Sequence, residues 1–411
     1  MNEQVGSEQV GTEQVETVLA DQAPLAPYDL VLLMSFGGPE APEEVVPFLR
    51  RVTAGRGIPD SRLEEVGEHY FGFGGRSPIN DQNRGLLREL RAELGRRGIT
   101  TPVVWSNRNS EPFLPDVLQQ AYADRARRVL AITTSAFGSY SSCRQYREDL
   151  GMAVADLPDD LHIDQAFQID KVRPYFNHPG FVQANGFTLA AALQQLVATR
   201  PVPGAEPPLV VFVTHSIPDA MADGSAAEAP EGAGYTRQHE VLATEVIRDA
   251  TARLAERHPD AVPGGWELTY CSRSGSPHTP WLEPDVNDRL VELAAAGVRE
   301  VVLAPIGFVS DHMEVAFDLD TEARETATEH GIRVVRAATA GLQPAFVSGL
   351  VDLALERAAE ARAEQATSAA SAPEPAVVGE LPAWPSRCRP GCCLARAGQP
   401  TDRPTLCEQT A

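Results

Sequence analysis

The stretch Val301-Val-Leu-Ala-Pro305-Ile-Gly-Phe-Val-Ser-Asp-His-Met-Glu314-Val-Ala-Phe-Asp318-Leu-Asp-Thr-Glu322 joins a short apolar run to three carboxylates that are spaced four residues apart. The run predicts a buried strand, and the segment after it predicts a helix over residues 314–329. On such a helix Glu314, Asp318 and Glu322 share one face, where each like-charged pair costs roughly 0.2–0.5 kcal/mol. A divalent metal would neutralise this row. Alternatively, Asp311 caps the helix with Glu314 as its capping-box partner, and the other two carboxylates are solvated.

The same change from an apolar run to a helical pattern recurs along the chain, which predicts an α/β fold. Strands alternating with helices are typical of parallel sheets covered on both faces, so we expect two similar doubly wound domains with parallel sheets. The expected strands are residues 28–35, 102–105, 128–133 and 161–167 in the first half and 209–214, 266–271, 298–306 and 332–337 in the second. The expected organisation is a disordered acidic tail over 1–27, domains over 28–176 and 177–342, a helix over 343–365 that packs back on the body, a linker over 366–387, and a cysteine-containing tail over 388–411.

Charge is the unusual feature of the composition. The 411 residues include 35 basic and 57 acidic ones, a net charge of −22, and Lys171 is the only lysine. This argues against binding to nucleic acid or to an anionic membrane, because both need a basic surface. The acidic N-terminus has no apolar signal segment, and no apolar run is long enough to span a bilayer, so we predict a cytoplasmic protein. In that compartment cysteines are metal ligands or buried thiols rather than disulfides.

Polar residues at the ends of the expected strands are the first candidates for a site, because ligands of open parallel sheets lie beyond the carboxyl ends of the strands. His215 follows the apolar run 209–213, and Glu314 follows another strand of the same half. A histidine at this place can accept a proton or bind a metal as the neutral ring, or its ring can simply be fixed by backbone hydrogen bonds. We expect His215 and Glu314 to face one cavity.

The residues around His215 and Glu314 resemble signatures of the ferrochelatase family. Thr214-His-Ser-Ile-Pro218 is similar to the family's His-Ser-Leu-Pro, and the segment 307–318 is similar to its Gly-Phe-x-x-Asp-His-x-Glu-x-x-x-Asp. The resemblance runs from residue 28 to about residue 357. Three further stretches agree in order and spacing: Ser35-Phe-Gly-Gly-Pro39, Phe73-Gly-Gly-Arg-Ser-Pro-Ile-Asn80 and Pro280-Trp-Leu-Glu-Pro-Asp285.

This resemblance implies insertion of Fe²⁺ into a porphyrin in haem biosynthesis, on two Rossmann-like domains of the class II chelatase type. It implies that His215 and Glu314 face each other across the macrocycle at the metal site, with Asp318 and Glu322 extending a path for the metal. The chemistry agrees, since metallation removes two pyrrole protons and a neutral imidazole near the ring nitrogens can accept a proton. Carboxylates bind Fe²⁺ loosely enough to release it.

The resemblance also implies which residues contact the porphyrin. Ser77 and Tyr140 match porphyrin-contacting positions of the soluble Gram-positive branch, whose substrate is coproporphyrin III. Phe36 stands in the first strand-end loop, where several coproporphyrin-type enzymes have a tyrosine that can reach iron, and a phenylalanine cannot ligate. Coproporphyrin carries four carboxylates, and the forked guanidinium groups of Arg56 and Arg76 are the candidates for binding them.

The charged segment 52–75 lies where membrane-bound relatives have an apolar lip, which argues against stable membrane anchoring and favours coproporphyrin III over protoporphyrin IX. The alternatives are a protoporphyrin IX ferrochelatase, a chelatase for another metal or tetrapyrrole, and a non-catalytic porphyrin or haem carrier. The expected partners are the porphyrin, Fe²⁺, and the preceding and following enzymes of the haem pathway.

Four of the six cysteines lie near the C-terminal end. Some ferrochelatases carry a [2Fe–2S] cluster with C-terminal cysteine ligands and one internal ligand, and the resemblance implies the same here. Zinc suits four thiolates equally well, and a mobile redox-sensitive tail is a third interpretation. Cys271 is expected to be a buried thiol. The candidate ligands are Cys143, Cys388, Cys392 or Cys393, and Cys407.

Overall fold

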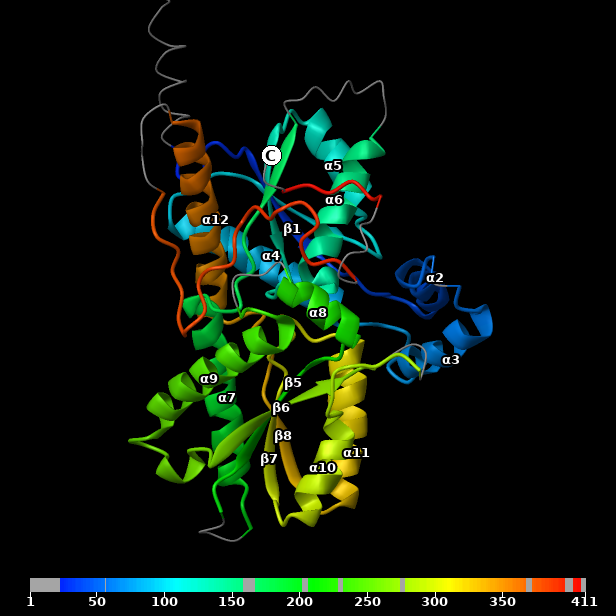
Figure 1. The fold of residues 1–411 in the computed structure, drawn as a ribbon, viewed down its shortest axis with the longest axis vertical. Coiled ribbons are helices and arrows are strands. Elements are labelled where there is room, and N and C mark those ends of the chain that lie inside the picture. Colours follow the sequence, from blue (N-terminus) through cyan, green and yellow to red (C-terminus); the bar gives the residue numbers. More distant parts are fainter. Residues whose placement is uncertain are drawn as a thin grey trace, which may run out of the picture.

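The computed structural model describes residues 23–55, 57–157, 167–201, 206–227, 232–273, 278–366, 372–395 and 402–407, and it contains two four-stranded parallel sheets (Figure 1). The first sheet has the order β2 (Val103–Asn107), β1 (Leu30–Ser35), β3 (Arg128–Thr133) and β4 (Gln168–Lys171). The second has the order β6 (Gly265–Cys271), β5 (Leu209–His215), β7 (Glu300–Ala304) and β8 (Arg333–Arg336). The two halves therefore repeat one topology, and the predicted α/β fold with two parallel sheets is confirmed.

The register of the strands brings their carboxyl ends together at one edge of each sheet. In the first sheet Ser35 pairs with Asn107, and in the second His215 pairs with Cys271. The six residues of β1 are all buried, as expected for a central strand that is covered on both faces. Polar side chains are thus concentrated where the strands end.

Helices cover both faces of each sheet, because alternate residues of the central strands point to opposite faces. Val31 and Leu33 of β1 pack in a core with α4 (Ile79–Arg96), whereas Leu32 packs with α5 (Leu114–Ala123) and α6 (Gln145–Ala155) on the other face. In the second half, α7 (Pro179–Ala198) and α9 (Tyr235–Leu254) cover one face of the sheet, and α10 (Val286–Ala295) and α11 (Arg324–Glu329) cover the other.

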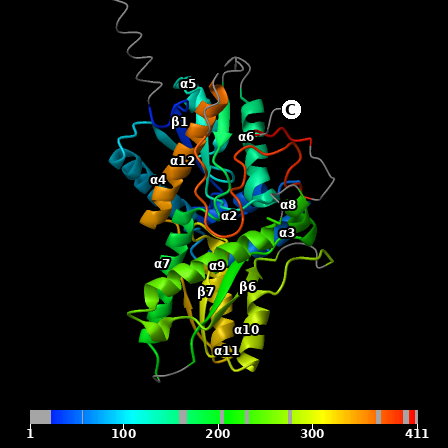
Figure 2. The same ribbon diagram turned by 60° about the vertical axis from the view of Figure 1, so that its left-hand side comes forward.

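The C-terminal helix α12 (Pro344–Gln365) packs against α4, α7 and β3, and so it returns from the second half to cover the first sheet (Figure 2). The segment after it departs from the linker that its composition predicts. Residues 372–387 lie against the body. Leu381 and Trp384 are buried, and the side chain of Asn177 donates hydrogen bonds to the carbonyls of Leu381 and Pro382. The few apolar side chains of this Pro-rich segment are enough to hold it in place.

A small helical lobe stands to one side of the first sheet (Figure 1). It consists of α2 (Pro42–Val52) and α3 (Asp60–Phe71), which pack on each other around Phe48 and Leu63. The remaining short helix, α8 (Asp219–Ala227), follows β5. No helix among the described residues is long and apolar enough to cross a membrane.

Several sequence predictions fall partly outside the described residues. The predicted strand 161–167 overlaps residues 158–166, which are not described, and the fourth strand of the first sheet follows directly at Gln168–Lys171. Most of the predicted tail 1–27 also lies outside, but Leu25 and Tyr28 are buried in the main core. The predicted helix 314–329 is present, although its first part, η4 (Val315–Ala323), has π-helical hydrogen bonding.

Candidate active site

His215 and Glu314 meet at the junction of the two halves. His215 is the last residue of β5, and Glu314 immediately precedes η4, which follows β7. The His215 Nε2 atom lies 3.5 Å from the Glu314 Oε1 atom. The other ring nitrogen, Nδ1, bonds to the carbonyl oxygen of Ser216, which fixes the orientation of the ring. The structure therefore places these two side chains next to each other.

The pair is ionised at neutral pH. Burial lowers the pKa of His215, but the charge and hydrogen bond of Glu314, helped by the Ser216 carbonyl, outweigh burial and raise that pKa to about 9. Burial raises the pKa of Glu314, but the His215 charge and hydrogen bond lower it to about 2. The side chains keep 32% and 44% of their surface exposed, so solvent still screens the pair.

The carboxylate row extends away from this pair. Asp318 accepts a hydrogen bond from the hydroxyl of Ser272, which follows β6. Burial and the charges of Glu314 and Glu322 raise the pKa of Asp318 to about 7, despite the Ser272 hydrogen bond. The pKa of Glu322 is also raised, mainly by burial. The row is thus close enough to interact, and Asp318 can exchange a proton near neutral pH.

The backbone that carries this row is unusual. η4 is a nine-residue π-helix, and π-helical turns are rare and often occur at functional sites. A second one, η1 (Tyr140–Arg144), follows the strand β3 of the first half and leads into α6. Both of these turns lie at carboxyl ends of their sheets, where the site is expected.

Three residues near the pair were not singled out from the sequence. His312 Nδ1 lies 3.8 Å from Glu314 Oε2, and burial lowers the pKa of His312, so this ring is neutral. His69 of α3 stacks on Phe317, with 3.9 Å between ring centroids. The next residue, Tyr70, is close enough for the charges of Glu314 and Asp318 to contribute to its raised pKa, although burial is the main cause. The small helical lobe therefore closes over the site, which only long-range packing could reveal.

A buried network holds the backbone at His215 in place. The Thr214 hydroxyl bonds to His239 Nε2 at 2.9 Å and to the Tyr235 hydroxyl at 3.0 Å. The Tyr235 hydroxyl donates in turn to the His215 carbonyl at 3.1 Å. His239 also stacks on Phe137 of the first half, so this network couples the strand end of His215 to the junction between the halves.

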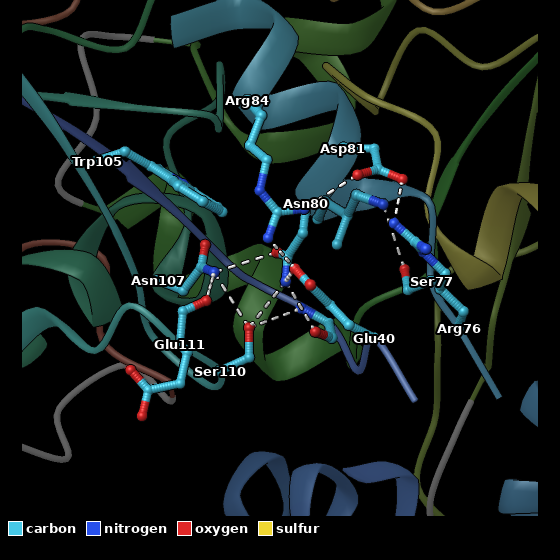
Figure 3. Close-up of polar contacts among 12 residues, drawn as sticks. Glu40, Arg76, Ser77, Asn80, Asp81, Arg84, Trp105, Asn107, Ser110 and Glu111 are labelled. Atoms are coloured by element: carbon cyan, nitrogen blue, oxygen red, sulfur yellow. Dashed lines mark hydrogen bonds and ion pairs between the residues drawn. The ribbon is translucent and has the colours of Figure 1, made fainter. Parts of the chain in front are cut away.

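Ser77 belongs to a polar network that fixes the loop after β1 (Figure 3). The backbone N–H of Ser77 donates to the Pro39 carbonyl at 2.9 Å, and its side chain is buried against Gly38, where any Cβ would collide with it. Asn80 donates to the Gly38 carbonyl at 3.0 Å and receives a bond from Asn107 at 3.1 Å. The Ser77 hydroxyl itself accepts a hydrogen bond of 3.5 Å from the Ile79 N–H, so Ser77 helps to shape this loop.

Three of the other predicted porphyrin contacts have partners within the protein. Phe36 packs edge-on against Phe48 in the core of the small lobe. The Tyr140 hydroxyl donates to Glu148 at 3.1 Å. Arg76 forms an ion pair with Asp81 on the surface (Figure 3). Arg56 lies outside the described residues.

All six cysteines are buried and in the free thiol form. Apart from Cys271, they are Cys143 and the four cysteines of the C-terminal tail. Hydrogen bonds connect the Cys388 thiol to those of Cys143 and Cys392. Arg147 Nη1 lies 3.1 Å from the Cys392 sulfur, and Cys143, Cys388 and Cys407 are also close enough to Arg147 to interact with it electrostatically. Cys392 rather than Cys393 therefore adjoins this arginine. Within the described ranges, no group of three or more His, Cys, Asp or Glu side chains is arranged to hold a metal ion.

The fold and the site define a class of protein with two parallel α/β halves and a histidine–carboxylate pair at their junction. The family model described as Ferrochelatase matches residues 28–358 of this chain. The chain therefore belongs to the ferrochelatase family.

Individual relatives agree with this assignment. The chain is 49% identical to a coproporphyrin III ferrochelatase of Streptomyces coelicolor, over 93% of this chain and 97% of that protein. It is 46% identical to a coproporphyrin III ferrochelatase of Leifsonia xyli, over 89% of this chain and 91% of that protein. It is 41% identical to a ferrochelatase of Rhodopirellula baltica, over 92% of this chain and 96% of that protein. Among solved structures, it is similar to SirB from Bacillus subtilis with Fe³⁺, at 12% identity and a TM-score of 0.43, over 82% of this chain and 97% of that one.

Proposed function

We propose that the protein inserts Fe²⁺ into coproporphyrin III, with His215 and Glu314 on opposite faces of the macrocycle. The observation that carries this proposal is the His215–Glu314 pair at the junction of the halves, in a chain nearly half identical to coproporphyrin III ferrochelatases. Iron is a substrate in this reaction, and the four ring nitrogens supply most of its final ligands.

The distance between the His215 and Glu314 side chains is too short for a porphyrin to lie between them. A flat macrocycle needs about 3.5 Å of contact distance on each face, or roughly 7 Å between the two side chains. The pair is 3.5 Å apart, so binding must separate His215 from Glu314. Separation removes the main influence that raises the pKa of His215, and burial then favours the neutral imidazole. On porphyrin binding the His215 imidazolium then releases its proton to solvent, and the neutral ring can accept a pyrrole proton.

The second pyrrole proton and the metal need a route on the other side of the ring. We assign this route to Glu314, Asp318 and Glu322, because the pKa of Asp318 is raised to about 7 and lets it exchange protons at physiological pH. Oxygen ligands also hold Fe²⁺ weakly enough to pass it on.

The test is anaerobic Fe²⁺ insertion followed by absorbance, with coproporphyrin III and protoporphyrin IX in parallel. We expect faster turnover with coproporphyrin III and loss of turnover in His215→Ala. The matched control is His258→Ala, because His258 is exposed in a surface turn. A chain that binds coproporphyrin tightly but never metallates it is a carrier, and faster insertion of another divalent metal indicates a different chelatase. Full activity of His215→Ala contradicts the assignment of the base.

We also propose that the tail thiols hold a [2Fe–2S] cluster, with Cys143, Cys388, Cys392 and Cys407 as ligands. The donor set fits in kind, since these thiols are buried around the cationic Arg147, and a cluster with four thiolates carries net negative charge. When bound, such a cluster supplies one-electron redox chemistry. The backbone of Cys407 has a φ of 60°, a conformation that non-glycine residues adopt only when their surroundings impose it.

Anaerobically purified protein should then contain iron and acid-labile sulfide and absorb in the visible range. Stoichiometric zinc without sulfide would assign the thiols to zinc instead. Colourless protein without bound metal would leave the redox-sensitive tail as the interpretation. Binding of coproporphyrin propionates by Arg56 and Arg76, a cytoplasmic location and docking of neighbouring haem-pathway enzymes stay predictions from the sequence.

A further inference from the structure

Glu148 of α6 is a fully buried carboxylate that the proposed chemistry does not use. Its side chain has 0% exposure, and its partner Arg144 has 5%, with 2.9 Å between Arg144 Nε and Glu148 Oε1. Burying an ion pair costs desolvation that the attraction often only offsets, so such a pair is weak evidence of a stabilising role. A role in placing another group explains its position better.

The group that Glu148 holds is Tyr140. The second carboxylate oxygen, Oε2, accepts a hydrogen bond of 3.1 Å from the Tyr140 hydroxyl. Tyr140, Arg144 and Glu148 are spaced four residues apart, so the turn of η1 and the start of α6 bring them onto one face. One carboxylate oxygen of Glu148 accepts from Arg144 and the other accepts from Tyr140, so the Tyr140 hydroxyl is held in place.

The far side of Arg144 connects this unit to the cysteine-containing tail. Arg144 Nη1 donates to the Cys392 carbonyl at 3.0 Å. The neighbouring Arg147 donates from Nε to the Leu406 carbonyl at 2.8 Å and accepts a backbone bond from the Leu406 N–H at 3.2 Å. The tail therefore lies directly against the helix that carries Glu148.

We propose that Glu148 is a positioning residue for Tyr140, and that Arg144 fixes Glu148 to the cysteine-containing tail through the Cys392 carbonyl. This inference rests on the proposed function, in which Tyr140 contacts the porphyrin. A tyrosine hydroxyl has one proton to donate, and here Glu148 accepts it. Tyr140 then cannot donate to a propionate carboxylate, and it meets the macrocycle with its ring.

This arrangement predicts equal and non-additive effects of two substitutions. Tyr140→Phe removes the hydroxyl, and Glu148→Gln leaves one acceptor oxygen for two donors. Each should raise the KM and the dissociation constant for coproporphyrin III by about threefold to tenfold, while kcat stays within twofold, because only the anchoring hydrogen bond is lost. The double variant should be no worse than either single one. Tyr140→Ala should be more severe, because it also removes the ring.

The measurements are steady-state kinetics of insertion and a porphyrin fluorescence titration without iron, with the unfolding midpoint of every variant as a check on folding. The control is Glu300→Gln, because Glu300 is also buried and pairs with Arg200 and Arg333, but it lies at the amino end of β7. If Glu148→Gln does not fold, Glu148→Asp is the substitute. It keeps a negative charge to pair with Arg144, while its shorter side chain moves the carboxylate away from the Tyr140 hydroxyl.

The outcomes separate the inference from the function on which it rests. A wild-type KM and dissociation constant in Glu148→Gln, beside raised values in Tyr140→Phe, overturn the inference and leave the function intact. Additive effects in the double variant also overturn it. Unchanged binding in Tyr140→Phe overturns the inference, and unchanged binding in Tyr140→Ala overturns the porphyrin contact of Tyr140 as well. Arg144→Lys, whose single ammonium replaces the fork, should match Glu148→Gln, and unchanged binding there overturns the connection to the tail.

Discussion

Replacing Glu314 by glutamine should free His215 from its ion pair. Glu314 is the main influence that raises the pKa of His215 from its ordinary value of 6.5 to about 9. At about 1.36 kcal/mol per pH unit, this rise of about 2.5 units corresponds to roughly 3 kcal/mol. Because 32% and 44% of the two side chains are exposed, solvent screening should leave on the order of 1 kcal/mol.

The pH range of this stabilisation follows from the signs of the two changes. The raised pKa of His215 stabilises the folded protein fully below pH 6.5 and ceases to do so as pH rises through 9. The lowered pKa of Glu314 stabilises it above pH 4.5 and ceases to do so as pH falls through 2. The Glu314→Gln variant should therefore be less stable than the wild type near pH 6 and equal to it near pH 10.

The assays are denaturant unfolding at pH 6 and pH 10 and NMR titration of the histidine ring protons, with His215→Ala to assign the signal. The matched control is Glu325→Gln, since Glu325 is an exposed carboxylate of α11. A wild-type His215 that titrates near 6.5, or one whose titration is the same in Glu314→Gln, would refute the ion pair. The account of proton acceptance on porphyrin binding would then fall with it.

Three further predictions concern the tail, the α7 cap and the metal path. Gly138→Ala should lower the free energy of unfolding by about 1–3 kcal/mol, because a Cβ there would lie 2.5 Å from the rigid ring of Trp384; denaturant titration followed by tryptophan fluorescence measures this. His178 is buried with its pKa lowered to about 4, so the fold should lose up to about 3 kcal/mol as pH falls from 6.5 through 4, and His178→Asn should remove this dependence. Asp318→Asn should raise the KM for Fe²⁺ by about threefold to tenfold and leave the KM for coproporphyrin III unchanged.

A different result would contradict each of these three predictions. Gly95→Ala is the control for the first, because a Cβ there meets nothing within 4 Å, and equal losses in both variants would refute the packing argument. Unaltered acid sensitivity in His178→Asn would assign that sensitivity to other groups. An Asp318→Asn variant that changes only the porphyrin KM would remove Asp318 from the metal path.

The fold could be predicted from the sequence to a large extent, because strands that are buried on both faces appear as continuous apolar runs. Leu30–Ser35 and Leu209–His215 were predicted nearly to the residue. The edge strand Gln168–Lys171 was not predicted, since its alternation of exposed and buried residues gives a weaker signal. The helix α3 was missed inside a Gly-rich segment, because it packs on α2 around a small core that no local pattern reveals.

By itself, the sequence determined the parallel sheets, the strand end at which His215 stands, and the spacing of Glu314, Asp318 and Glu322. These are consequences of periodicity, which acts between near neighbours in the chain. Only the tertiary structure decided that the pair meets at 3.5 Å, that His69 and Tyr70 close over it, and that Glu148 and Arg144 connect the Tyr140 hydroxyl to the Cys392 carbonyl. These contacts join residues far apart in the chain, or depend on burial that raises or lowers a pKa, and the packing of the two halves creates them.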